Sequence, residues 1–178
     1  ATVNADDLFS TVDNASSAIA KANAINDSSE FTGVRAIAEA TIVVGTSDIA
    51  AVTLDSANNL AINGQVITGI RVEANDANDK VVNAINAESA DTGVVASLDE
   101  DNRLVLEAAD GRNVEVVVSG AASGLGIAIG GGGVSAVFGG QITLQSEDQI
   151  VMTGNGTDKL GDVGGANANR FGVNSQHA

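Results

Sequence analysis

The side chains that most often carry out catalysis are scarce in this sequence. Cysteine, tyrosine and tryptophan are absent, and the only histidine is His177, one residue from the end. Nucleophilic catalysis by serine needs a neighbouring base, usually histidine, and zinc sites are built from clusters of histidine and cysteine. We therefore expect His177 to be a terminal residue without a catalytic role. The sequence leads us to assign no catalytic, cofactor-binding or metal-binding residue.

Acidic side chains are the remaining candidates for chemistry. The 23 Asp and Glu residues could include a glycosidase pair, but a sequence does not give the separation of two carboxylates. The run Asp99-Glu100-Asp101-Asn102 could offer several oxygens to calcium, although it lacks the spacing of an EF-hand loop. Asp and Asn also favour turns, because their side chains bond to the local backbone. We interpret the run as a solvated turn.

A glycine-rich stretch nearly forms a dinucleotide-binding loop. Gly124, Gly126 and Gly130 have the spacing G-x-G-x-x-x-G, which is one residue longer than the phosphate-binding pattern, and no helix signal follows them. The sequence therefore does not favour a phosphate site here.

The composition narrows the class of protein. The formal net charge is −15 and the eight Lys and Arg residues are scattered, so the chain offers no basic surface to nucleic-acid phosphates or anionic membranes. Aromatic residues make up only 2% of the chain, which leaves Val, Ile, Leu and Ala to form the core and favours strands. Residues 1–20 show no signal peptide, and the start at Ala1 rather than Met indicates a fragment or a processed product.

A stretch of fourteen residues occurs twice, and this repeat indicates the elements that organise the chain. Residues 23–36 return as residues 83–96 at an offset of 60 (83 − 23), with nine identical positions: Asn, Ala, Ile, Asn, Ser, Thr, Gly, Val and Ala. Self-similarity of this kind marks a repeated supersecondary unit. Each copy consists of an apolar helical stripe that ends at Ile-Asn, a polar connector and a strand that opens with Thr-Gly-Val.

Apolar residues at three- and four-residue spacing predict two helices, over residues 12–26 and 76–88. Because the copies should be structurally alike, Ile25 and Ile85 should both be buried at helix ends. In the same way, the glycines that follow the connectors, Gly33 and Gly93, should both begin strands. The candidate N-caps are Asp13 or Asn14 for the first helix and Asn75 or Asp76 for the second.

Alternating hydrophobicity predicts strands through most of the remaining chain. Asn63-Gly64 and Asp110-Gly111 each lie between two such segments and are typical of tight hairpins. The order is strand, strand, helix and then three strands, which predicts an α+β fold: antiparallel hairpins with short helices packed on the sheet. The predicted strands cover residues 60–62, 66–67, 94–98, 103–108 and 113–118, with shorter ones at 142–144 and 150–152.

The rest of the chain is rich in glycine and lacks regular patterns. Residues 119–140 carry no charge and contain nine glycines, so we expect a flexible loop rather than a membrane helix. The final residues, 153–178, should be loosely ordered. The predicted division is residues 1–57 for the first Ile-Asn unit, 58–127 for the second, and 128–178 for the loop, a strand pair and the tail, all within what could be one compact domain.

Several short blocks occur in the order found in a known family. They are Leu60-Ala61-Ile62-Asn63-Gly64, Ile67-Thr68-Gly69-Ile70, Ala84-Ile85-Asn86, Thr92-Gly93-Val94, Leu104-Val105-Leu106 and Ala109-Asp110-Gly111-Arg112-Asn113-Val114. Together they resemble the flagellin hook IN motif over about residues 58–127, with a partial first copy at 12–36. Residues 141–148 also look like a strand pair common in flagellin outer domains. The long terminal coiled-coil helices of a filament core have no counterpart here.

The resemblance implies a surface-exposed outer region of a bacterial flagellin, which would be secreted and structural and would have no catalysis and no cofactor. Its partners would be neighbouring flagellin subunits, contacted through core regions outside this chain, while the chain itself would be monomeric. Two alternatives remain. One is a hook-associated, cap-type or adhesin binding module, and the other is a carbohydrate-active enzyme with an acidic cleft.

Overall fold

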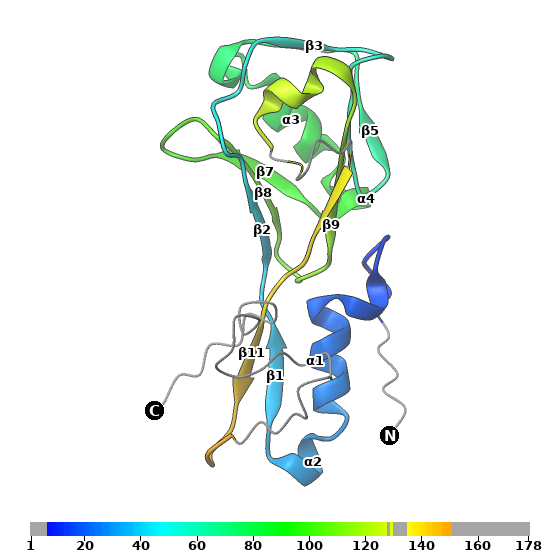
Figure 1. The fold of residues 1–178 in the computed structure, drawn as a ribbon, viewed down its shortest axis with the longest axis vertical. Coiled ribbons are helices and arrows are strands. Elements are labelled where there is room, and N and C mark those ends of the chain that lie inside the picture. Colours follow the sequence, from blue (N-terminus) through cyan, green and yellow to red (C-terminus); the bar gives the residue numbers. More distant parts are fainter. Residues whose placement is uncertain (1–6, 128, 130–134, 151–178) are drawn as a thin grey trace.

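The computed structural model describes residues 7–127, 129 and 135–150, and within them the molecule is elongated, with two lobes joined by a narrow neck (Figure 1). The small lobe consists of α1, α2, β1 and β11. The large lobe contains β2 to β10 together with α3 and α4. At the neck, residues 39–40 run beside residues 139–141, and the Glu39 N–H donates to the Gln141 carbonyl at 2.8 Å.

The elements are short. The helices are α1 (Ala18–Asn26), α2 (Ser29–Thr32), α3 (Lys80–Ala87) and α4 (Ser89–Thr92), with 3₁₀ helices η1 (Asn14–Ser16), η2 (Ala74–Asp76) and η3 (Gly120–Leu125). The strands are β1 (Arg35–Ala38), β2 (Thr41–Val44), β3 (Val52–Leu54), β4 (Leu60–Ile62), β5 (Gln65–Ile67), β6 (Ile70–Val72), β7 (Val95–Leu98), β8 (Leu104–Ala108), β9 (Val114–Val118), β10 (Ser135–Phe138) and β11 (Ile142–Gln145).

All strand pairs among the described residues are antiparallel, which confirms the predicted α+β class with antiparallel hairpins and short helices. The strand orders are β1-β11, β10-β9-β4-β5, β2-β8-β7 and β3-β6. Two segments pass through the neck and change partners there. The chain of β1 continues into β2, which pairs with β8, and the chain of β10, paired with β9, continues into β11.

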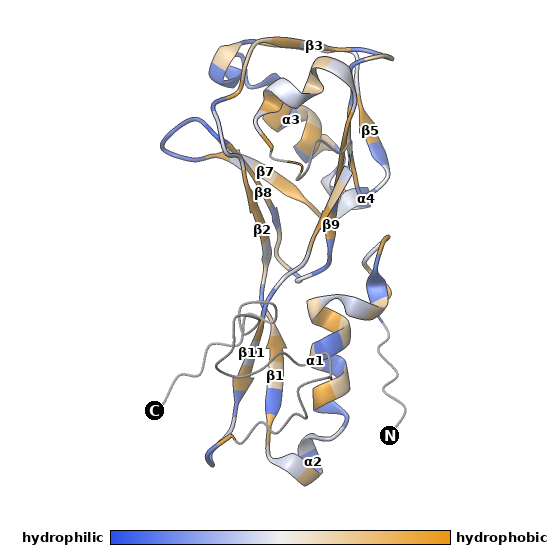
Figure 2. Cartoon of the chain, in the orientation of Figure 1, coloured by the Kyte–Doolittle hydropathy of each residue, from blue (hydrophilic) through white to orange (hydrophobic). Residues whose placement is uncertain are grey.

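Each lobe has its own hydrophobic core, built almost entirely of aliphatic residues as the composition predicts. The large-lobe core runs from Val43 to Ile127 and includes the fully buried Ile85 and Leu106. The small-lobe core is much smaller and rests on Ala18, Ala22, Ala36 and Ile142. In Figure 2 the strands of the large lobe are mostly hydrophobic, whereas hydrophilic and hydrophobic residues alternate along α1.

The hairpin at Asn63-Gly64 is confirmed. Strands β4 and β5 pair with Leu60 opposite Ile67 and Ile62 opposite Gln65. Asn63 and Gly64 both have positive φ, at 48° and 87°, as a type I′ turn requires.

We predict that Gly64→Val lowers the free energy of unfolding by about 1–2 kcal/mol, because a side chain at this φ suffers left-handed backbone strain. A Cβ at Gly64 would meet no atom within 4 Å, so backbone strain is the main cause. Urea denaturation followed by circular dichroism measures the change. Gly64→Asn is the matched control, since Asn tolerates this region. Equal midpoints for Gly64→Val and the parent would contradict the argument.

Both helix starts differ from the predictions. Helix α1 begins at Ala18, and its cap is Ser17, whose hydroxyl accepts from the Ala20 N–H at 3.0 Å; neither Asp13 nor Asn14 caps it. Helix α3 begins at Lys80, later than the periodicity indicates. Its N-cap residue is Asp79, whose side chain makes no capping hydrogen bond, so the prediction of Asn75 or Asp76 at that position is wrong. The buried Asp76 carboxylate nevertheless accepts from the N–H groups of Val81 and Val82 in the first turn, at 3.0 Å each.

The predicted hairpin at Asp110-Gly111 is wrong. Strands β8 and β9 lie in different sheets, because β8 pairs with β2 and β7 while β9 pairs with β4 and β10. The connector is held by other parts of the chain: the Thr41 hydroxyl donates to the Arg112 carbonyl at 2.7 Å, and the Asn113 N–H donates to the Ser10 hydroxyl at 2.8 Å. These partners turn the chain away from its neighbouring strand.

The glycine-rich stretch 119–140 contains more structure than expected. Helix η3 contributes the buried Ala122 and Leu125 to the large-lobe core, and strand β10 pairs with β9. Of the flexible loop, Gly130 to Gly133 lie outside the described residues. The strand predicted at 142–144 is β11, but Ile150 is not in a strand. Met152 and the predicted tail 153–178 lie outside the described residues.

Candidate functional site: the asparagine clamps and the polar network at the neck

The repeated sequence has a structural counterpart, a pair of asparagine side chains that each bind one strand. Asn86 at the end of α3 accepts from the Ala96 N–H at 2.7 Å and donates to the Ala96 carbonyl at 3.0 Å. Asn26 at the end of α1 does the same to Ala36, at 2.8 and 2.9 Å. We call these two arrangements the asparagine clamps. Each clamp ties the last turn of a helix to the middle of the following strand.

The connector between helix and strand is also duplicated. The Thr92 hydroxyl donates to the Glu88 carbonyl and accepts from the Val94 N–H at 3.1 Å, and Thr32 makes the equivalent bonds. Gly33 and Gly93 have φ of 67° and 68° and end the short helices α2 and α4. The prediction that these glycines begin strands is therefore wrong, because β1 and β7 start two residues later.

The two units differ in how deeply their isoleucines are buried. Ile85 is fully buried in the large-lobe core, as predicted. Ile25 is only half-buried at the edge of the small-lobe core, so the prediction for Ile25 is wrong. The large lobe places further strands over its helix, whereas in the small lobe the described strands against α1 are β1 and β11.

The pairing of strands extends the repeat beyond the fourteen residues. In the large lobe β7 pairs with β8, with Ala96 opposite Leu106 and Leu98 opposite Leu104. In the small lobe β1 pairs with β11, with Ala36 opposite Leu144 and Ala38 opposite Ile142. Strand β11 thus takes the place of β8, so the first unit is completed by a strand from the far end of the described chain. The large lobe is inserted within it.

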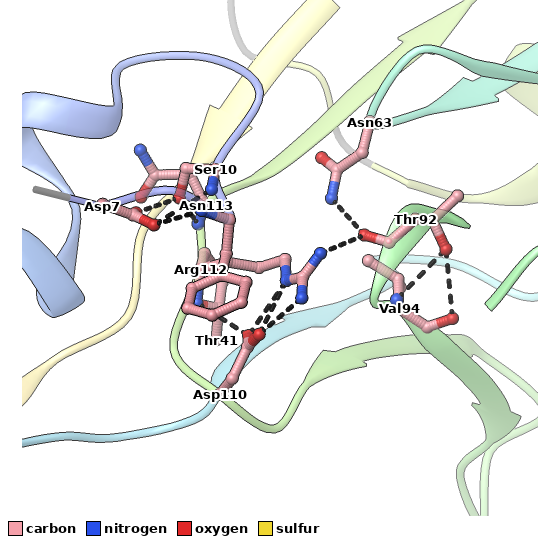
Figure 3. A network of polar contacts seen from close by, with 10 residues as sticks. Asp7, Ser10, Thr41, Asn63, Thr92, Val94, Asp110, Arg112 and Asn113 are labelled. Carbon is pink, nitrogen blue, oxygen red and sulfur yellow. Dashed lines mark hydrogen bonds and ion pairs between the residues drawn. The ribbon is translucent and has the colours of Figure 1, made fainter. Parts of the chain in front are cut away.

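A polar network centred on Arg112 lies where the large lobe meets the neck (Figure 3). The Arg112 guanidinium is paired with the Asp110 carboxylate, with Nη2–Oδ2 at 2.6 Å, and Nη1 donates to the Thr92 carbonyl at 3.3 Å. Partial burial opposes ionisation of Asp110, but hydrogen bonds from the Arg112 side chain and N–H hold its pKa below the ordinary value. The guanidinium also occupies the space that a side chain at Gly93 would need.

Asn63, in the turn between β4 and β5, also belongs to this network. Its side chain donates to the Thr92 carbonyl at 2.8 Å and accepts from the Glu115 N–H at 2.8 Å, and the residue is buried. Asn63 therefore does more than turn the hairpin, since it links β4, β9 and the connector after α4. The hairpin signal identified the residue, but nothing in the sequence indicated these partners.

The N-terminal segment 7–13 reaches the same place. The buried Asp7 carboxylate accepts from the N–H groups of Phe9 and Ser10, at 2.8 and 3.1 Å, and from the Ser10 hydroxyl. Burial alone would raise the pKa of Asp7, but the hydrogen bonds from Ser10, Ser17 and Phe9 together lower it below its ordinary value. The Arg112 guanidinium lies 5.4 Å from the centre of the Phe9 ring, within cation–π range.

The acidic run at 99–102 forms a turn between β7 and β8, as interpreted from the sequence. Its first carboxylate is occupied: Asp99 accepts from the N–H groups of Asp101 and Arg103 and pairs with the Arg103 side chain at 2.7 Å. The N–H of Arg103, followed by its guanidinium, lowers the pKa of Asp99. Among the described residues no three His, Cys, Asp or Glu side chains gather closely enough to hold a metal ion.

The glycines at 124 and 126 pack against backbone. The Gly124 carbonyl accepts from the Ala50 N–H and the Gly126 carbonyl from the Thr46 N–H, both at 2.8 Å. A side chain at Gly126 would overlap the Ser47 carbonyl. These residues therefore join η3 to the segment after β2 and do not surround a phosphate. Gly130 and His177 lie outside the described residues.

Comparison with known proteins places the clamp of the large lobe in a named motif. The family described as "Flagellin hook IN motif" matches residues 59–110. Flagellin A of Helicobacter pylori is 40% identical over 104 residues, which cover 58% of this chain and 20% of that protein. Flagellin B of H. pylori is 36% identical over 139 residues, covering 73% of this chain and 26% of that protein. Flagellin A of Helicobacter felis is 41% identical over 96 residues, covering 53% and 18%.

The chain therefore contains a flagellin hook IN motif and is partly homologous to Helicobacter flagellins A and B, as the resemblance of the short sequence blocks implies. It spans about a fifth to a quarter of the length of these relatives. The flagellin family is a family of structural proteins. Within residues 7–127, 129 and 135–150, no helix combines the length and the apolar character needed to cross a bilayer.

Proposed function

We propose that this chain is the outer, surface-exposed region of a bacterial flagellin and that it contributes structure to the filament exterior without catalysing a reaction. The observation that carries the proposal is the hook IN motif at 59–110, with its helix, clamp and strands folded as one unit. The two-lobed shape with a narrow neck suits a projection from a larger assembly (Figure 1).

The test uses the full-length flagellin that carries this region. Antibodies raised against the chain should label intact filaments along their whole length in electron microscopy. A flagellin with residues 7–150 deleted in frame should still form filaments, which should be thinner and should lose the label. Labelling confined to the hook junction or the filament tip would favour the hook-associated or cap alternative. Loss of filament assembly would contradict a purely external position.

The enzyme alternative needs its own measurement. The carboxylates of Asp76, Asp99 and Asp110 each bind backbone N–H groups or arginine side chains of the chain itself. The proposal therefore expects no turnover of polysaccharides. Turnover that is abolished by changing a single Asp or Glu would replace the structural proposal with the enzymatic one.

We predict that the isolated chain is monomeric, because a net charge of −15 opposes self-association. In the proposed filament, contacts between subunits would come from regions outside this chain. Sedimentation equilibrium at physiological salt and high protein concentration should return a mass near 17.6 kDa. A tight dimer would show that this region itself carries a subunit interface.

A further inference from the structure

The connection between the two lobes is slender. Within the described part of the chain, residues 39–40 and 139–141 cross the neck, with the Glu39–Gln141 main-chain bond between them. A pair of glycines, Gly139 and Gly140, forms one of the two crossings. Hinges between domains are built from a few loop residues of this kind, which absorb changes of φ and ψ. Two short crossings alone would leave the angle between the lobes loosely fixed.

Segment 7–13 adds a third connection, at a distance from the two crossings along the chain. It leads directly into η1 and the capped start of α1 in the small lobe, yet its side chains and carbonyls contact the loop after β8 in the large lobe. The Asn113 N–H donates to the Ser10 hydroxyl at 2.8 Å, and the Asn113 amide donates to the carbonyls of Val12 and Asp13 at 3.1 Å each.

We propose that residues 7–13 act as a strap that fixes the angle between the lobes, and hence the direction in which the large lobe projects. Three of the groups involved are buried: Asp7 at 2% exposure, Ser10 at 8% and Asn113 at 3%. Removing one partner of a buried hydrogen bond leaves the other without a partner, so loss of the Ser10 or Asn113 side chain should weaken the docking of the strap. The Arg112–Phe9 contact adds a second attachment.

The strap sits on the part of the large lobe that is already tied to the neck. The Arg112 carbonyl accepts from the Thr41 hydroxyl, at the first residue of β2, and the Gly111 backbone lies close to Glu39. Docking of the strap therefore attaches α1 of the small lobe to the base of the large lobe at a third place, away from the two crossings. Because two crossings define an axis of bending, a third attachment off that axis removes the bending motion.

Distance measurements between spin labels test the strap directly. The chain contains no cysteine, so Glu30→Cys on α2 and Thr68→Cys after β5, both exposed, supply the only labelling sites. In the parent, double electron–electron resonance should give one narrow distance distribution. Ser10→Ala combined with Asn113→Ala should broaden it and shift its mean. Phe9→Ala combined with Ser10→Ala should act in the same direction, and both of these changes lie outside the hydrophobic cores.

Asn78→Ala is the matched control, because Asn78 also donates its amide to a carbonyl, that of Arg71, but within the large lobe alone. The control should leave the distance distribution as it is in the parent. Circular dichroism shows that each variant is folded. If folded strap variants keep the narrow parental distribution, the two crossings fix the angle by themselves and the proposal is overturned. Broadening in Asn78→Ala would also overturn it, since the effect would then not depend on the strap.

Discussion

Ile85→Ala should lower the free energy of unfolding by about 2–5 kcal/mol, the range for shortening large side chains in well-packed cores. Ile85 has no exposed surface and lies in the large-lobe core. The substitution removes three carbons from a core of Val, Leu, Ile and Ala, and the surrounding structure fills such a cavity only partly. The chain has no tryptophan or tyrosine, so urea unfolding is best followed by far-ultraviolet circular dichroism.

The repeat supplies a matched comparison for this variant. Ile25 occupies the equivalent position in the first unit but is only half-buried. Ile25→Ala should therefore shift the urea midpoint less than Ile85→Ala does. An unmoved midpoint in Ile85→Ala would mean that the helix does not pack as described. Equal large shifts in both variants would mean that the small lobe is as tightly packed as the large one.

The local elements could be predicted from the sequence because their signals are local. The pair Asn63-Gly64 specifies positive φ at two successive positions, and few structures other than a tight hairpin use it. The alternation in β8 and β9 agrees with the observed burial, since Leu104, Leu106 and Val116 all lie in the core. The repeat gave the helix, connector and strand of each unit, although the strands start later than Thr-Gly-Val indicates.

The arrangement of the sheets could not be predicted, because it depends on partners distant in sequence. Asp110-Gly111 carries the same local hairpin signal as Asn63-Gly64, yet its flanking strands belong to different sheets. Two distant partners decide which way the chain runs after β8. The Thr41 hydroxyl donates to the Arg112 carbonyl, and the Ser10 hydroxyl, 103 residues before Asn113, accepts from the Asn113 N–H. A hairpin signal describes the turn and says nothing of such competitors.

The polar site was missed for a similar reason. Asn26 and Asn86 are the last residues of the repeated Ile-Asn pair, so the repeat did identify them, but as helix ends rather than as ligands of a strand. Two copies of an asparagine at the same place, each followed ten residues later by an alanine, form the signal that could have revealed the clamps. Asn113 occurs outside the repeat and had no such signal.

Asn86→Ala should lower the free energy of unfolding by about 2–5 kcal/mol, since it leaves two groups of one residue without partners and each costs about 1–3 kcal/mol when buried. These groups are the N–H and the carbonyl of Ala96, which is only 3% exposed. The better helix propensity of alanine offsets a few tenths of a kcal/mol of this loss. The urea midpoint again provides the measurement.

Two further variants separate the clamp from a general effect of losing an asparagine. Asn83→Ala changes an exposed asparagine on the same helix and should leave the midpoint unchanged or slightly raised. Asn86→Asp keeps an acceptor for the Ala96 N–H but at neutral pH loses the donor to the Ala96 carbonyl, so it should be destabilised although its size is conserved. If Asn86→Asp were as stable as the parent, the bond to the carbonyl would contribute nothing. The clamp would then act through a single hydrogen bond.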